Sequence, residues 1–391
     1  MGEWKNVRVG ELGKIITGKT PKTSISDNYG GRIPFLTPSD NMSVKYVGKT
    51  SKTLTEKGLL EVKNAILPEN SVCVSCIGSD LGKAVITTCP TVTNQQINSI
   101  IVDKKSFDVS FVYYAMQILG KKMNFISKTS TAVPIVNKSS FSSYEIKCPP
   151  REDQKRIAAV LSALDSKIEC NKKINDNLYA QVKAIFSENF LNLDFLPDGW
   201  KTGNLLDIAD YLNGLAMQKY RPKDGETGLP VLKIKELRQG ICDANSELCS
   251  PSIKSEYIIH DGDIIFSWSG SLLVDIWCGG TCGLNQHLFK VTSNNYDKWF
   301  YYLWTAHHLD RFIAVAADKA TTMGHIKREE LEKAEVIIPS KCDYKRISTL
   351  IKPLFDLIIS NRIENRKLTA LRNTLLPKIM SGEIDVSDIQ L

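Results

Sequence analysis

The chain has 391 residues, of which 42% are hydrophobic and 24% are charged, and its formal net charge is +7. This length suits two to three domains, and this composition is typical of a globular protein rather than a disordered or fibrous one. No apolar run is long enough to span a bilayer and the first residues lack the apolar core of a signal peptide, so we expect a cytoplasmic protein whose ten cysteines are reduced core residues.

Each half of the chain begins with short β-rich runs separated by breaks of Gly, Pro, Asn and Ser, and continues into one helical segment. The predicted strands are Val72–Ser75, Ala84–Thr88, Asn98–Val102, Ile264–Ser267 and Leu288–Thr292. The predicted helices that follow them cover Phe111–Leu119 and Trp299–Ala314. This mixture predicts a mixed α+β domain of about 150 residues in each half.

The two halves also match residue by residue, with a separation that drifts only from 190 to 196 positions. The matching pairs are Trp4 and Trp200, Ile33–Leu36 and Leu229–Leu232, Asn94–Gln95 and Asn285–Gln286, and Lys128–Thr131 and Lys319–Thr322. The chain is therefore predicted to contain two copies of one unit.

A long helix is predicted at the end of each copy, because apolar residues recur there with alternating spacings of four and three. In the segment Asp153–Phe190 the positions with this spacing are Ile157, Leu161, Leu164, Ile168, Asn171, Asn175, Leu178, Val182 and Ile185, all of them apolar except the two asparagines. The positions 190 residues later are Ile347, Ile351, Leu354, Ile358, Asn361, Asn365, Leu368, Arg372 and Leu375. A heptad pattern of this kind indicates a helix packed on another helix.

Two such helices of about forty residues, each about 60 Å long, pack most simply as an antiparallel coiled coil with pseudo-twofold symmetry. In that arrangement Asn171 or Asn175 approaches Asn361 or Asn365. Buried asparagines in a helical seam reduce stability but fix the register. The alternative is that these side chains face solvent.

A chain that holds two similar domains at a fixed separation suits a ligand with the same spacing. Double-stranded DNA is such a ligand, since half-sites one turn (about 34 Å) or more apart present the same face.

The sequence resembles the specificity subunits of type I restriction-modification systems along nearly its whole length. The motifs that carry the resemblance are Ile16–Pro21, Ile33–Asp40, Asp153–Ala158, Leu164–Ile168 and Leu375–Ile384. The second copy departs from the family pattern at Cys342–Tyr344, where a Glu-Gln pair is usual, and at Phe355, which corresponds to Asp165. These departures bear on whether both helices make equal partner contacts.

The resemblance implies two pseudo-symmetric α+β target-recognition domains separated by a long antiparallel two-helix coiled coil. The first domain would be residues 1–150 and the second domain residues 191–340, with helical regions at 151–190 and 341–391. The subunit would have no chemistry and no cofactor of its own. It would read a bipartite duplex DNA site, one half per domain, set the spacer through the helices, and recruit two adenine methyltransferase subunits that use S-adenosylmethionine. Restriction subunits that use ATP and magnesium would complete the complex.

Polar residues in loops at corresponding places of the two copies are the candidates for DNA contact. In the first domain they are Thr17, Lys19, Thr20, Lys22, Ser39, Asp40, Gln95, Gln96, Ser130 and Thr131. In the second domain they are Gln218, Lys219, Arg221, Lys233, Lys235, Ser267, Ser269, Asn285, Gln286, His287, Thr321, Thr322 and His325. Gln and Asn read adenine and Arg reads guanine, whereas Lys, Ser and Thr more often hold phosphates. The alternative for Ser39, Asp40 and Asn285 is that they brace turns or cap a helix.

Two other functions compete with DNA recognition. Gly13–Thr20 matches the P-loop pattern of nucleotide-hydrolysing enzymes, but Pro21 and a loop composition follow where a helix is required. The third possibility is a coiled-coil scaffold that binds proteins and no DNA. Cys73 and Cys76, or Cys278 and Cys282 near His287, do not form the paired spacing of a zinc site, so we predict no metal. The sequence shows no catalytic constellation.

Overall fold

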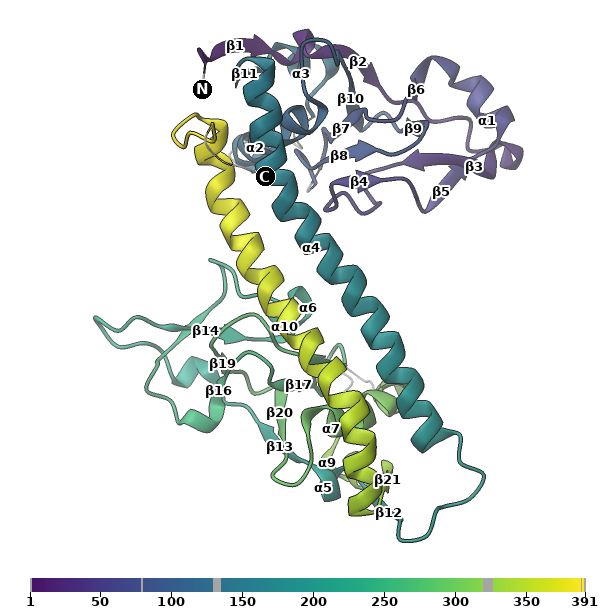
Figure 1. The fold of residues 1–391 in the computed structure, drawn as a ribbon, viewed down its shortest axis with the longest axis vertical. Helices are drawn as coiled ribbons and strands as arrows, with labels where there is room; N and C mark the ends of the chain where they lie inside the picture. Colours follow the sequence, from purple (N-terminus) through teal and green to yellow (C-terminus); the bar gives the residue numbers. More distant parts are fainter. Residues whose placement is uncertain (1, 79, 129–134, 319–325, 388, 390–391) are drawn as a thin grey trace. The chain divides into compact units, whose positions relative to one another are not determined.

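The structure, a computed structural model, describes residues 2–78, 80–128, 135–318, 326–387 and 389 (Figure 1). The chain divides into two compact units, one of residues 1–166 with 369–391 and one of residues 167–368. Both divisions fall inside long helices. Each unit therefore contains one β-rich domain and a section of each long helix.

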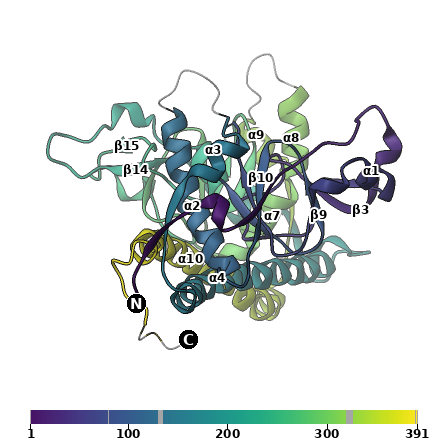
Figure 2. The same cartoon turned by 90° about the horizontal axis from the view of Figure 1, so that it is seen from above.

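Within its described residues the first domain contains three sheets and three α-helices. The largest sheet has the order β2 (Gly13–Thr17), β10 (Ile97–Val102), β7 (Val72–Ser75), β8 (Ala84–Thr87) and β4 (Tyr46–Val47). A second sheet has the order β5 (Lys52–Leu54), β3 (Tyr29–Leu36), β9 (Thr91–Thr93) and β6 (Ile66–Leu67), and a third pairs β1 (Lys5–Arg8) with β11 (Glu145–Cys148). The helices are α1 (Glu56–Glu61), α2 (Val109–Lys128) and α3 (Lys138–Ser143). The second sheet and α1 lie on the side of the domain away from α2 (Figure 2).

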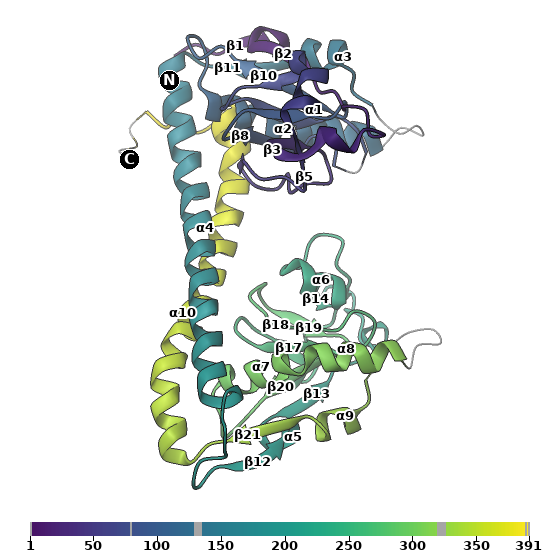
Figure 3. The ribbon, with the colours of Figure 1, turned by 90° about the vertical axis from the view of Figure 1, so that its right-hand side faces the viewer.

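The second domain repeats this plan. Its largest sheet has the order β13 (Asp210–Asn213), β20 (Leu288–Thr292), β17 (Ile264–Ser267) and β18 (Leu273–Ile276). The other sheets are β15 (Leu248–Cys249), β14 (Leu229–Leu232), β19 (Cys282–Leu284) and β16 (Ile258–Ile259), and the pair β12 (Lys201–Asn204) and β21 (Glu335–Ile338). The helices are α5 (Leu205–Ile208), α6 (Ile234–Gln239), α7 (Lys298–His307), α8 (Leu309–Asp318) and α9 (Arg328–Glu332). Figure 3 shows α7 and α8 beside the largest sheet.

Strand registers show that the two domains share one fold. Ser75 of β7 pairs with Ile97 of β10, and Ser267 of β17 pairs with Leu288 of β20, which are corresponding positions of the repeat. The parallel pair of β3 and β9 likewise corresponds to the parallel pair of β14 and β19. The predicted α+β class with two similar mixed domains is therefore confirmed.

The predicted helices need two adjustments. The segment predicted at Phe111–Leu119 extends over the whole of α2, whose residues 111–116 are all buried. The segment predicted as one helix at Trp299–Ala314 is divided at His308 into α7 and α8. The His308 ring lies 2.7 Å from the carbonyl oxygen of Glu335 in β21, so the break places a polar side chain against the neighbouring sheet.

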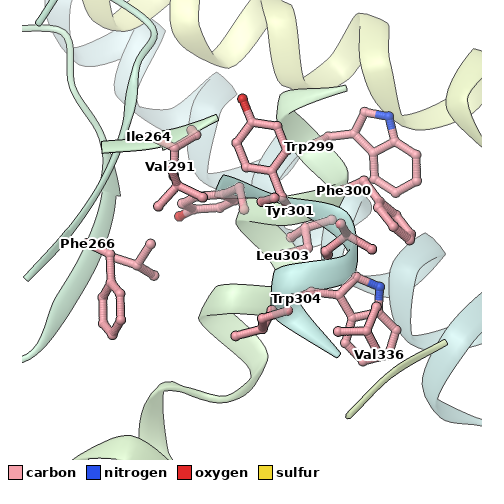
Figure 4. Packing of buried hydrophobic residues seen from close by; sticks show 14 of the residues in the cluster. Ile264, Phe266, Val291, Trp299, Phe300, Tyr301, Leu303, Trp304 and Val336 are labelled. Carbon is pink, nitrogen blue, oxygen red and sulfur yellow. The ribbon is translucent and has the colours of Figure 1, made fainter. Parts of the chain in front are cut away.

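The core of the second unit joins the domain to the long helices. Trp299, Phe300, Leu303 and Trp304 of α7 belong to one buried cluster with Ile264, Phe266 and Val291 of the largest sheet, and Trp304 lies beside Val336 of β21 (Figure 4). The same cluster contains Val182 and Phe186 from one long helix and Ile347 and Ile351 from the other. Full burial of a large apolar side chain contributes about 1.5–3 kcal/mol. The halves of the helices are thus part of the domain core.

The long helices are α4 (Arg151–Phe186) and α10 (Lys341–Met380), and they pack together in both units. In the first unit Ile157 and Leu161 of α4 share a buried cluster with Leu376 and Ile379 of α10. A short π-helix, Ser187–Leu191, continues α4 at its end.

In the second unit the helix pair contains four asparagines in facing positions. The Asn171 amide donates to Asn365 Oδ1 at 3.0 Å, and the Asn361 amide donates to Asn175 Oδ1 at 2.9 Å. Residue numbers therefore rise by four along α4, from Asn171 to Asn175, as they fall by four along α10, from Asn365 to Asn361. The two helices are thus antiparallel. Asn171 also donates to the Glu364 carboxylate at 2.7 Å, and both Asn171 and Asn361 are buried.

Polar contacts fasten each domain to its half of the helix pair. In the first unit Lys45 Nζ donates to Ser162 Oγ of α4 at 2.6 Å, while Asp165 accepts from Tyr114 of α2 at 2.6 Å and from Arg372 of α10 at 2.7 Å. In the second unit Arg362 and Arg366 of α10 each bind an aspartate of the domain through two nitrogens, with all four distances between 2.6 and 2.8 Å. Bidentate pairs of this kind fix orientation as well as distance.

Among the helices of the described residues, none is both long and apolar enough to cross a membrane.

Replacing Asn175 by alanine should destabilise the chain by about 1–3 kcal/mol, because the buried Asn361 amide would lose its acceptor. Urea unfolding measures this cost. The control is Lys173→Ala on the exposed side of α4, which should change stability by less than about 0.5 kcal/mol. Equal effects of the two substitutions would contradict a stabilising role for the asparagine contact.

The stability of the chain should rise between about pH 8 and 10.5 through Lys45. Burial lowers the pKa of Lys45 to about 8 from 10.5, against the opposing effect of Asp165 and Asp108. Between these values the unfolded chain holds a proton that the folded chain has released, so folding becomes more favourable as the pH rises. In the variant Lys45→Met this contribution should be missing, and unfolding free energies at about pH 7.5 and about pH 9.5 test it as a difference between the two proteins. The same pH dependence in both would refute it.

Candidate DNA-binding interface

In each domain several of the predicted polar residues lie beside the end of the largest sheet where three of its strands begin or end. In the first domain β2 and β7 end there and β10 begins, and β13, β17 and β20 do the same in the second domain. The antiparallel registers place Thr17 opposite Asn98 and Asn213 opposite Phe289. Loops that leave this end carry most of the candidate residues.

A glycine follows β2 and β13 because the backbone passes very close to a neighbouring loop. A Cβ on Gly18 would lie 2.1 Å from the carbonyl oxygen of Asn94, and a Cβ on Gly214 would lie 2.2 Å from that of Asn285. No side chain fits at such distances. This contact explains Gly18 without a phosphate ligand. Residues 13–17 of the P-loop pattern form strand β2, paired with β10, instead of a phosphate-binding turn.

The loop after β2 meets the loop before β10 through side chains. Thr20 Oγ1 donates to Gln95 Oε1 at 2.6 Å in an exposed position, and the Asn94 amide donates to Gln96 Oε1 at 2.9 Å. Lys19 and Lys22 are exposed nearby. These residues form an accessible polar surface with two cations, which suits phosphates and base edges.

Ser39 and Asp40 belong to a braced turn. The Asp40 carboxylate accepts the backbone N–H groups of Thr37 at 2.8 Å and of Ser51 at 2.7 Å. Partial burial acts to raise the pKa of Asp40, but these hydrogen bonds outweigh it and the pKa is lowered. The turn-bracing alternative from the sequence is the arrangement observed.

Three of the basic candidates of the second domain have acidic neighbours. Arg221 lies 3.1 Å from Glu247, and Lys233 pairs with the same carboxylate. The hydrogen bond from Lys233 lowers the pKa of Glu247. Lys235 lies 3.8 Å from Asp243. Gln218 and Lys219 are exposed on a 3₁₀ turn, Met217–Lys219.

The remaining described candidates of the second domain differ in exposure. Ser267 and Ser269 are buried, and Ser267 Oγ donates to the Ser269 carbonyl at 3.3 Å. Asn285 is buried and its Oδ1 accepts the His287 N–H at 3.3 Å, as expected for a turn brace. Gln286 and His287 are partly exposed, with their Nε2 atoms 3.3 Å apart. Ser130, Thr131, Thr321, Thr322 and His325 lie outside the described residues.

The sequence reasoning missed Asn213 and Trp268, which lie at this same end of the second domain's sheet. Trp268 follows β17 directly, and its Nε1 donates to Asn213 Oδ1 at 3.0 Å. Ser267 and Ser269 on either side were predicted from their polarity. A tryptophan between them is unusual for a loop, and this signal could have identified it.

The cysteines considered as metal ligands are thiols of the core. Cys73 and Cys76 are buried, and burial raises the pKa of Cys73 to about 12. Cys278 and Cys282 are buried as well. Within the described residues no group of three or more His, Cys, Asp or Glu side chains could hold a metal ion.

Comparisons with known proteins agree with this architecture. The sequence profile of the family described as type I restriction modification DNA specificity domain matches residues 1–180 and 197–371. The chain is 28% identical over 416 residues to the type I restriction enzyme MjaIX specificity subunit of Methanocaldococcus jannaschii, covering 99% of this chain and 95% of that one. It is 24% identical to the EcoKI specificity subunit of Escherichia coli, covering 97% and 89%.

A solved structure shows the same fold. The S subunit of a type I restriction-modification system from M. genitalium superposes with a TM-score of 0.59 at 16% identity, covering 96% of each chain. The family profile spans both domains and most of both long helices. The chain therefore belongs to the type I restriction modification DNA specificity domain family, as the non-catalytic specificity subunit of a type I restriction-modification system with two target recognition domains.

Proposed function

We propose that each domain reads one half of a bipartite duplex DNA site, and that α4 and α10 set the spacer between the halves and recruit two methyltransferase subunits. Residues 1–150 and 191–340 are the two readers, and residues 151–190 and 341–391 are the helical regions. The observation that carries this proposal is the repeated sheet end, which presents loop side chains at the same place of the same scaffold in both domains.

The chemistry of the two sheet ends supports recognition of different half-sites. The first domain offers Thr20 and Gln95 with the exposed Lys19, and the second offers Gln286, His287 and Asn213. Side-chain amides can read base edges in the major groove, whereas lysines hold phosphates without sequence preference. Because the same scaffold carries different residues, each domain would select its own bases.

Partner docking is assigned to the outer surface of the helices. Leu350 and Leu357 of α10 are 50% and 45% exposed and lie one heptad apart, and Ile174 of α4 is 40% exposed. Apolar side chains at heptad spacing on an outer helix face suit a further protein surface. The methyltransferase would bring S-adenosylmethionine, and restriction subunits would bring ATP and magnesium.

Replacing residues 1–150 by the first recognition domain of another family member should change one half of the target and leave the other half intact. The chain would be co-expressed with its methyltransferase in a strain without other adenine methylation, and methylated adenines mapped across the genome. A change in both halves would contradict independent reading. Absence of methylation in the unmodified complex, together with DNA binding that does not weaken as salt is raised, would favour a scaffold without DNA recognition.

Lengthening both helices by one heptad should lengthen the spacer by about three base pairs, because seven residues add about 10.5 Å and one base pair occupies about 3.4 Å. The insertions are placed after Ser166 of α4 and after Leu368 of α10, where the two compact units meet in sequence, and so spare Asp165, Arg366 and Arg372. Mapping methylated adenines reads the spacer directly.

The control for this insertion lengthens α4 alone. The contacts of α4 with α10 in the first unit, such as Asp165 with Arg372, then no longer match the register that the asparagine pairs fix in the second unit, and methylation should be abolished. A doubly lengthened chain that still methylates with the original spacer would refute the helices as the measure of separation.

A further inference from the structure

Trp268 occupies a prominent place at the sheet end of the second domain. Its indole N–H donates to Asn213 Oδ1 at 3.0 Å, and its ring lies 5.7 Å from the ring of Phe289 and 6.2 Å from that of His287, centroid to centroid. Trp268 is partly exposed and Asn213 is exposed. The indole thus packs beside an aromatic ring, is held by a hydrogen bond from its N–H, and is partly exposed.

The corresponding position of the first domain is Cys76, since each residue directly follows the strand that pairs with β10 or β20. There the arrangement is closed. Asn98 donates to Cys76 Sγ at 3.3 Å and to the Val136 carbonyl at 3.1 Å, and it accepts from Thr17 at 2.7 Å. Cys76 and Asn98 are each 3% exposed. The repeat therefore holds a buried network of small groups in one domain and a partly exposed aromatic side chain in the other.

The first domain shows that this end of the sheet can be covered by small, buried, hydrogen-bonded side chains alone. The second domain instead leaves part of a large apolar ring in contact with solvent, which is unfavourable in the free chain. The ring has few conformations available because Asn213 and Phe289 hold it. A held aromatic surface next to amide side chains is a chemistry that recognises base-pair edges, where apolar groups contact the thymine methyl and amides pair with adenine.

We propose that Trp268, positioned by Asn213 and lying beside His287, is a specificity-determining residue that contacts base-pair edges in the half-site of the second domain. This inference rests on the proposed reading of one half-site by each domain. The contact is uncharged, so it selects sequence without neutralising phosphate. Its removal should alter base preference and leave the salt dependence of binding unchanged.

The test uses the complex of the full chain with its methyltransferase and a duplex library in which both half-sites are randomised. Bound duplexes are sequenced for the unmodified complex and for Trp268→Ala. In the variant, preference at one or more positions of the second domain's half-site should fall about tenfold, with the first domain's half-site unaltered. The slope of affinity against salt, measured on one fixed duplex, should be the same for both complexes.

Two further variants separate a contact with DNA from a role in folding. Trp268→Phe keeps an aromatic ring over Phe289 and loses the hydrogen bond to Asn213, so it should fold normally and lose part of the preference. Cys76→Ala changes the corresponding position of the first domain and should alter neither half-site. The melting temperature of each complex verifies assembly.

The outcomes divide cleanly. Unaltered preference in both Trp268 variants overturns this inference and leaves the proposed function standing, as does a loss of preference in both half-sites. If the unmodified complex itself selects no bipartite sequence, the proposed function fails. Relaxed preference confined to the second half-site, with an unchanged salt slope, supports the inference.

Discussion

The pairing of α4 with α10 is the constraint on which the other parts of this chain depend, because it joins segments about 190 residues apart in a single register. Apolar side chains alone would fit several registers of a heptad seam almost equally well. Asparagine amides remove that freedom, since a slip of one heptad would leave Asn171 and Asn361 buried without their partners. The seam therefore combines non-specific attraction along its length with a specific match in the second unit.

Each domain is then tied to its own section of that pair by charge as well as by packing. In the second unit Arg362 and Arg366 of α10 bind Asp275 and Asp261. Asp275 lies in β18, the edge strand of the largest sheet, and Asp261 lies in the loop before β17. In the first unit the Asp165 carboxylate of α4 accepts hydrogen bonds from Tyr114 of the domain and from Arg372 of α10. The departure of the second copy at Phe355, which corresponds to Asp165, fits this difference. Phe355 is buried in the apolar cluster, and the fastening has moved to Arg362 and Arg366.

The sequence was informative wherever one periodicity extended over many residues or recurred in both copies. The helix seam, the buried strands Val72–Ser75 and Ile264–Ser267, and the duplicated fold could all be predicted in this way. The break at His308 could not, because it depends on a carbonyl of β21 that lies far along the chain. Individual site residues were the hardest feature to predict from the sequence. Asp40 and Asn285 are polar residue types that often bind ligands. In the folded chain, however, their side-chain oxygens accept hydrogen bonds from backbone N–H groups of the turns they brace. Trp268 was not among the candidates because they were chosen as polar loop residues, and the only polar group of an indole is its N–H.

The tight crossing at Gly18 and Gly214 has a consequence for how such a protein can change during evolution. Only glycine fits at the first residue of each of these loops, because a neighbouring carbonyl oxygen lies too close for any side chain. Immediately after Gly18, Lys19 and Thr20 are exposed to solvent. Substitutions are thus excluded at the glycine and tolerated at the exposed residues that follow it. New target sequences can therefore arise by substitution of exposed loop residues while the sheet beneath is unchanged.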